Sequence, residues 1–86
     1  MGEKLVGKVS HYFSRISVAA VDVTDGELNV GDEIHVRGAT TDLRQKLESM
    51  QLDNAPVNRA APGDSVGIKV AGVARKGDSV YVVTPD

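Results

Sequence analysis

The sequence contains no cysteine and no tryptophan, and only two tyrosines and one phenylalanine among its 86 residues. Without cysteine the chain can form neither disulfides nor thiolate metal sites, and this composition fits a reducing compartment. The chain has no apolar run long enough for a membrane span and no basic segment followed by an apolar stretch that would predict export. We therefore expect a cytoplasmic protein that does not enter membranes.

An excess of positive charge is also missing. Ten basic and twelve acidic residues give a net charge of −2. General electrostatic capture of nucleic acid requires clustered positive charge, so the composition argues against it, while a local basic face remains compatible with these numbers. The length predicts one domain over residues 1–86, with an ordered core at about 4–84 and a loose start at 1–3. The sequence does not indicate the oligomeric state.

Turns and short alternating segments dominate the pattern that is present. In the stretch 23–38, the Asp25-Gly26 turn precedes a short apolar run, and Ile34 and Val36 then alternate with polar neighbours. Side chains of a strand change face at every residue, so this alternation predicts a half-buried strand with His35 on its solvent face. Gly-Asp precedes a predicted strand at 31–32, 63–64 and 77–78. Asp is favoured in such turns because it bonds nearby backbone, so we interpret Asp25, Asp32, Asp64 and Asp78 as turn residues.

Further strands are predicted at 5–10, 16–23, 65–71 and 79–84, the last ended by Pro85. Both faces of 5–10 are partly apolar, so its inward set stays open. Residues 11–15 are interpreted as a loop, and the slip in alternation between Ile16 and Val23 predicts a β-bulge in that strand. The segment 43–53 is ambiguous, because Leu43, Leu47 and Met50 have helical spacing while a strand is also possible.

These elements predict an all-β protein, a small closed antiparallel β-barrel of roughly six to eight strands. The apolar side chains that alternate with polar ones are assigned to its core. They are Val9, Val18, Val21, Val23, Leu28, Val30, Ile34, Val36, Leu47, Val66, Ile68, Val70, Val80 and Val82.

A family resemblance rests on several motifs in order. Gly26-Glu27-Leu28-Asn29-Val30-Gly31-Asp32, the segment 49–52, Ala61-Pro62-Gly63-Asp64 and the segment 75–78 together resemble the second domain of translational GTPases of the elongation factor Tu/1-alpha type. The resemblance covers about Leu5 to Val83. It implies a closed β-barrel in which Arg44 to Leu52 is a strand, and we adopt the strand for that segment.

The resemblance does not extend to nucleotide chemistry. No G-x-x-x-x-G-K-[ST] loop occurs, so we expect no nucleotide binding and no GTPase activity. The family's charged residues around the aminoacyl end of tRNA correspond here to Gly7-Lys8, Ser10, Gln51 and Asn54, which lack those charges. The resemblance therefore does not imply aminoacyl-tRNA binding.

Candidate sites are few. His11 and His35 have no partners at metal-ligand or catalytic spacing, so we expect no metal, no cofactor and no enzymatic activity. Aromatic and basic side chains gather in His11, Tyr12, Phe13 and Arg15, and these are candidate partner-binding residues. The alternative is that Phe13 plugs one end of the barrel and Tyr12 covers it.

Arg37 and Arg44 are further candidates, on an outer face that Lys46 and Lys69 could share. The alternative for this face is a solvated surface of mixed charge. We interpret the protein as a non-catalytic binding module that contacts a ribosomal, RNA or translation-associated protein partner. The second hypothesis is a protein-interaction or accessory domain for an enzyme on another chain, because similar barrels follow the catalytic part of some collagenase-like peptidases.

Overall fold

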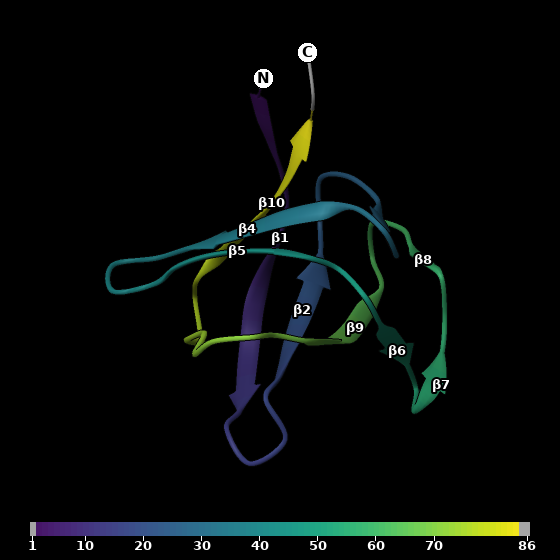
Figure 1. Ribbon diagram of the computed structural model, residues 1–86. Coiled ribbons are helices and arrows are strands. Elements are labelled where there is room, and N and C mark those ends of the chain that lie inside the picture. Colours follow the sequence, from purple (N-terminus) through teal and green to yellow (C-terminus); the bar gives the residue numbers. More distant parts are fainter. Residues whose placement is uncertain (1, 85–86) are drawn as a thin grey trace.

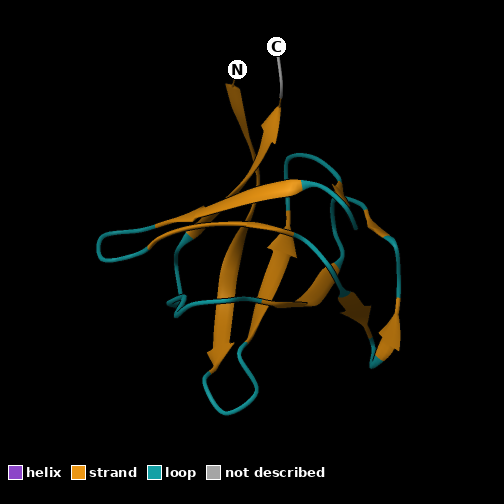
Figure 2. Ribbon diagram, viewed as in Figure 1, coloured by secondary structure: helices purple, strands orange, loops and turns teal. Residues whose placement is uncertain are grey.

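The computed structural model describes residues 2–84, and its regular structure in that range consists of strands (Figures 1 and 2). The strands are β1 (Gly2–Phe13), β2 (Val18–Val23), β3 (Leu28–Asn29), β4 (Glu33–Arg37), β5 (Asp42–Lys46), β6 (Met50–Leu52), β7 (Ala55–Pro56), β8 (Arg59–Ala60), β9 (Ser65–Lys69) and β10 (Ser79–Thr84). No helix in the described residues is long and apolar enough to cross a membrane. The expected end of the last strand at Pro85 lies outside the described residues.

Eight strands form one antiparallel sheet in the order β5-β4-β10-β1-β2-β9-β6-β7, and β3 pairs with β8 separately. The ends of the described chain lie side by side, because Gly2 of β1 pairs with Thr84 of β10 (Figure 1). The all-β prediction is confirmed. The loose start is wrong for Gly2 and Glu3, which belong to β1.

The sheet curls so that its outer strand β5 returns toward the end of β9. The side-chain amide of Gln45 donates a hydrogen bond to the Lys69 carbonyl at 2.9 Å and accepts one from the Ala71 backbone N–H at 2.6 Å. Backbone pairing between described residues stops at β5 on one side and β7 on the other. The ladder of backbone hydrogen bonds is therefore open, and a side chain spans the gap beside β5.

The segment that was ambiguous in the sequence is extended. Asp42–Lys46 and Met50–Leu52 are strands, joined by a bend at 47–49. The bend allows both Leu47 and Met50 to be buried, although three positions separate them. The apolar spacing that imitates a helix thus comes from two short strands with a change of direction between them.

Most of the predicted core residues are buried, but Val30 is 36 % exposed because it occupies a central position of a turn. Val18 and Val82 are only partly buried. Buried apolar residues that the sequence did not assign to the core are Val6, Ala19, Met50, Ala60 and Ala74. Ala60 faces Leu28 across the β3–β8 pair.

Two irregularities in β1 explain why its inward face could not be read from the sequence. The register shifts between Leu5 and Gly7 against β10, and between Val9 and His11 against β2. Each extra residue in a β-bulge reverses the phase of the side chains beyond it. As a result, Val6 and Val9 are both buried, although three positions separate them. Gly7 is required at the first irregularity, since a Cβ there would lie 2.3 Å from the Asp22 carbonyl oxygen.

The predicted bulge in the second strand is wrong in position. β2 alternates regularly, with Ala19, Val21 and Val23 buried, and the irregularity lies opposite it in β1. The apparent slip in the sequence arises because Ile16 belongs to the hairpin turn that precedes β2, and because Val18 faces outward on β2 together with Ala20. The predicted loop at 11–15 is also wrong for its first three residues, which continue β1 as far as Phe13.

The three Gly-Asp pairs have one common geometry. Gly31, Gly63 and Gly77 have φ of +102°, +99° and +92°, which suits glycine at the third position of a type II turn. In each turn the aspartate carboxylate accepts a hydrogen bond from the backbone N–H three residues earlier, at 3.1, 2.9 and 2.8 Å respectively. The interpretation of Asp32, Asp64 and Asp78 as turn residues is confirmed.

Each of these turns is hydrogen-bonded to one buried residue of a distant segment, which lies in a strand for two of the turns and directly after β5 for the third. The glycine N–H donates to that residue's carbonyl, and that residue's N–H donates to the aspartate carbonyl. The partners are Leu47, Val23 and Val9, for the turns at 31–32, 63–64 and 77–78. In each case the glycine and the aspartate together lie opposite a single partner residue. The first of the two is a glycine with positive φ, which is the arrangement of a G1 bulge. The turns set the register of the pairs β4–β5, β9–β2 and β10–β1.

We expect Asp64→Ala to lower the free energy of unfolding by about 1–2 kcal/mol, because the partly buried Ala61 N–H loses its acceptor. The measurement is the urea midpoint at neutral pH. Glu48→Ala is the control, since it removes an exposed carboxylate between β5 and β6. Equal midpoints for the two variants would contradict a structural role for the carboxylate.

Candidate interaction surfaces

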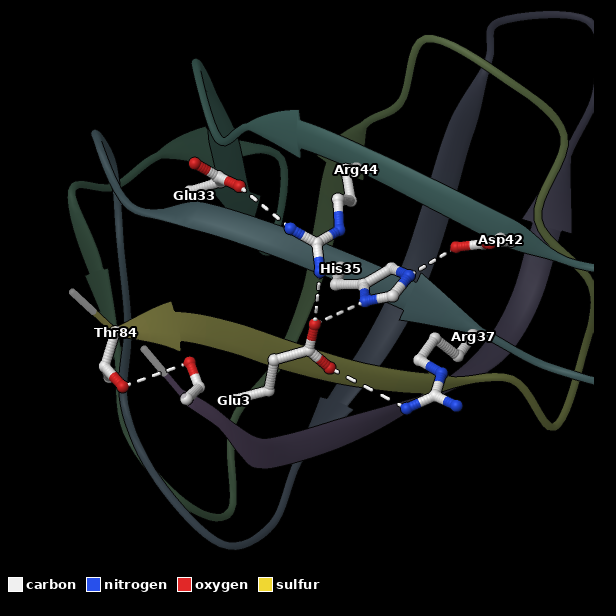
Figure 3. A network of polar contacts seen from close by, with 8 residues as sticks. Glu3, Glu33, His35, Arg37, Asp42, Arg44 and Thr84 are labelled. Carbon is white, nitrogen blue, oxygen red and sulfur yellow. Dashed lines mark hydrogen bonds and ion pairs between the residues drawn. The ribbon is translucent and has the colours of Figure 1, made fainter. Parts of the chain in front are cut away.

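A network of charged side chains covers the outer face of β4 and β5 beside the start of β1 (Figure 3). Glu3 from β1 lies at its centre. One Glu3 oxygen is 2.7 Å from Nδ1 of His35 and 2.9 Å from Nη2 of Arg44, and the other is 3.8 Å from Nη1 of Arg37. Arg44 also lies 3.8 Å from Glu33. The carboxylate of Glu3 therefore joins β1 to two strands that follow much later in the sequence.

His35 projects from the outer face of β4, as its alternation with Ile34 and Val36 predicts, but only 6 % of the residue is exposed. The prediction that it stands in solvent is wrong, because Glu3 covers it from β1 and Asp42 contacts Nε2 from β5. Each ring nitrogen thus faces a carboxylate oxygen. An imidazole with one N–H can donate to only one carboxylate, so both contacts are hydrogen bonds only in the imidazolium form.

The pKa of Asp42 is lowered from its usual value of 3.8, first by the hydrogen bond with His35 and then by the positive charges of His35, Arg37 and Arg44. Desolvation, which ranks second after the hydrogen bond, raises the pKa and so acts in the opposite direction. The Asp42 side chain remains 83 % exposed, so solvent screens these interactions. The contact fixes the position of the His35 ring more than it stabilises the fold.

The structure brings the candidates Arg37 and Arg44 together, but not as a free basic patch. Both lie against Glu3, and the Arg37 guanidinium carbon is 5.8 Å from the centre of the Tyr81 ring. Cross-strand neighbours on this face alternate in charge, with Arg37 opposite Asp42 and Glu33 opposite Lys46. The mixed-charge alternative describes this face. Asp42 was expected on this face as part of its mixed charge, but Glu3 was missed, since it is separated from His35 by 32 positions and carries no local signal.

The other candidates lie at the end of the β1–β2 hairpin, beyond the bulge at Ser10, and strand alternation directs Tyr12 to the opposite face from His11 and Phe13. Tyr12 packs against the core and its hydroxyl donates to the Gly72 carbonyl at 3.2 Å. His11 and Phe13 point outward with ring centroids 4.5 Å apart, and Phe13 is 45 % exposed. Phe13 therefore does not plug the barrel, which corrects that alternative. Arg15 is exposed in the hairpin turn.

A hollow of about 480 Å³ opens beside this hairpin on the outer face of β2, β9 and β6. Its lining includes Phe13, Ile16, Val18, Ala20, Gln51, Asp53, Asn54, Ser65, Val66 and Gly67. Two of these, Gln51 and Asn54, are positions where the sequence lacks the charges of the translation factors. Sequence reasoning singled out Phe13 but missed the hollow, because its floor consists of small residues from strands far apart in the chain.

Within residues 2–84, no three or more His, Asp or Glu side chains gather in a way that could hold a metal ion. The charged network around Glu3 and the hollow beside the β1–β2 hairpin differ in kind. One is a set of paired charges that fastens strands together, and the other is a largely apolar hollow with exposed side chains at its edge.

Comparison with known proteins identifies the family to which this fold belongs. Residues 17–79 match the family described as elongation factor Tu domain 2. The chain belongs to this family. This chain also superposes on GDP-bound aIF5B from Aeropyrum pernix with a TM-score of 0.66 and 19 % identity. The superposition covers 96 % of this chain and 14 % of that one. The same fold thus forms one small part of that much larger protein.

Peptidase-type proteins match most of this chain in sequence. It is 39 % identical over 77 residues to a collagenase of Porphyromonas gingivalis, and 33 % identical over 79 residues to an uncharacterised protease of Methanocaldococcus jannaschii. These matches cover 88 % and 91 % of this chain but only 21 % and 19 % of those proteins. The chain thus spans about a fifth of the length of the curated relatives it matches.

One solved structure has nearly the same extent as this domain. The C-terminal domain of a Geobacillus thermoleovorans protein named as a U32 peptidase superposes with a TM-score of 0.86 at 19 % identity, covering 94 % of this chain and 93 % of that one. At this identity the likeness concerns the fold alone. It shows that the fold occurs in peptidase-type proteins as well as in translation factors.

We expect Asp42→Asn to destabilise the domain above about pH 4 and to have less effect as the pH falls toward 2. The pKa of Asp42 is lower in the folded state, so its stabilising effect is present above the unfolded pKa and is lost as the pH falls through the folded one. Urea midpoints of both proteins between pH 7 and pH 2 measure the difference. Asp53→Asn, in the turn between β6 and β7, corrects for the loss of one negative charge, and a pH-independent difference would contradict the assignment.

Proposed function

We propose that the protein is a non-catalytic accessory module that binds protein and serves a peptidase-type enzyme on another chain, outside translation. The observation that carries the proposal is the 39 % identity to a collagenase of which the matching segment forms only a fifth. The fold of an isolated C-terminal domain from a U32-type protein, superposed over 94 % of this chain, supports the same assignment.

The surfaces of the domain favour this reading over a ribosomal or RNA partner. Arg37 and Arg44 are paired with Glu3, so they offer little uncompensated charge to phosphates. The apolar side chains of Phe13 and Ile16 are exposed, 45 % and 57 % respectively, as at sites that bind protein. No set of acid, base and nucleophile was recognised in the sequence, and this supports a non-catalytic role. A cytoplasmic location is part of the proposal, supported by the lack of cysteine.

We expect the purified chain to form a nuclease-resistant complex with a U32-type peptidase from the same organism, seen as co-elution in size-exclusion chromatography. Sedimentation with ribosomes at low and high salt is the second arm, and we expect the chain to stay in the supernatant in both. Co-sedimentation with ribosomes at low salt, together with no peptidase complex, would overturn the proposal in favour of the translation reading.

The closed barrel is a second part of the proposal. We infer that the curled sheet behaves as a closed barrel in which the Gln45 amide replaces a backbone ladder between β5 and residues 69–71. The support is the pair of hydrogen bonds in which the Gln45 amide donates to the Lys69 carbonyl and accepts from the Ala71 backbone N–H. A module closed in this way presents no long free edge next to β5 for pairing with other chains.

We expect Gln45→Ala to lower the free energy of unfolding by about 1–2 kcal/mol, since two hydrogen bonds are lost. It should also speed hydrogen exchange at the Ala71 amide, measured by NMR. Gln51→Ala removes the same side chain from an exposed position of β6 and serves as the control. Unchanged Ala71 protection in Gln45→Ala would mean that the gap is closed by something other than this side chain.

A further inference from the structure

The floor of the hollow beside the β1–β2 hairpin is formed by a row of paired residues across the sheet. Ala20 of β2 pairs with Gly67 of β9, and Gly67 pairs with Gln51 of β6. Directly paired residues of antiparallel strands project to the same face. The two central positions carry a methyl group and a hydrogen, so the face is depressed there while larger side chains surround it.

The walls of this hollow combine apolar and amide groups. Phe13 and Ile16 stand on the hairpin side, and both are exposed although they are large and apolar. Gln51 and Asn54 stand on the opposite side. Asn54 belongs to a two-residue hairpin turn in which it and Asp53 have φ of +65° and +51°, a conformation that fixes the direction of this wall. A carboxamide can donate and accept at once, which suits the N–H and C=O groups of a peptide.

The charge of the lining selects between possible occupants. Asp53 is its one charged side chain, and none of the lining residues is basic. A phosphate at this place would meet a carboxylate without a lining cation, which disfavours nucleic acid. An aliphatic side chain next to lysine or arginine would instead find both an apolar surface and a counter-charge. Resting on the proposed function, we propose that this hollow binds an extended peptide segment of a partner protein, with an aliphatic side chain over Ala20 and Gly67 and a basic residue beside Asp53.

The test uses the 86-residue chain and a blocked hexapeptide in which two adjacent leucines are flanked by lysines. We expect saturable NMR shifts at the amides of Ala20, Gly67 and Gln51 and the residues around them. The same peptide with serine in place of both leucines should bind much more weakly. Ala20→Gln fills the floor and should weaken binding at least about fourfold, which corresponds to losing the burial of roughly one CH₂ group.

Val73→Gln is the matched control, because Val73 is 64 % exposed and does not line the hollow. Ile16→Ser is a second test variant in the hairpin turn, for use if Ala20→Gln alters the fold. Scattered or non-saturable shifts, equal binding of the serine peptide, or unchanged affinity in both variants would overturn the proposal. So would stronger shifts of the same amides with octauridylate, which would assign the hollow to RNA.

The two proposals can fail separately. Peptide binding at these amides without any complex with a U32-type peptidase would leave the hollow as a peptide site and reject the accessory role for such enzymes. A peptidase complex that forms equally well with Ala20→Gln and Ile16→Ser would retain the accessory role and reject the hollow as its contact.

Discussion

A glycine with positive φ followed by an aspartate lies opposite one buried residue of a distant segment at three places, and the register of the sheet depends on this arrangement. The aspartate carboxylate closes the turn, and two backbone hydrogen bonds attach the turn to Leu47, Val23 or Val9. A slip of one residue would move every apolar side chain of the following strand to the outer face. The inward direction of Ile34, for example, therefore depends on the turn at Gly31 and Asp32.

The Gly-Asp turns keep apolar side chains directed into the core, whereas the bulge at Ser10 directs an aromatic side chain out of it. Without the extra residue, strand alternation would direct Phe13 to the same side as buried Val9. With it, Tyr12 turns inward toward the carbonyl of Gly72, and Phe13 and His11 turn outward beside the hollow. The exposed aromatic at the end of the hairpin is thus a product of β1 backbone geometry. Bulges commonly direct side chains in this way near functional sites.

The sequence predicted what depends on neighbouring residues. The Gly-Asp turns, the strand at 33–37 and most of the core followed from turn chemistry and alternation. It could not show which strand each turn would meet, because Leu47 and Val23 lie many positions away from the turns that hold them. The prediction that His35 is exposed to solvent failed for the same reason, since Glu3 covers it from the distant strand β1. The hollow was unreadable because Ala20 and Gly67 become neighbours only through the pairing of β2 with β9.

The difference between the two surfaces bears on where a partner binds. Arg37 and Arg44 of the charged face already contact Glu3, so a ligand there would have to replace these internal partners. Replacing them would leave the partly buried Glu3 carboxylate and the His35 ring with fewer partners, and leaving buried charged groups unpaired is costly. At the hollow, binding would cover Phe13 and Ile16, which are exposed to water in the free domain, and covering apolar surface is favourable. The balance of these two terms favours the hollow over the charged face as the place for the proposed peptide, although the basic residues of the sequence point to the charged face.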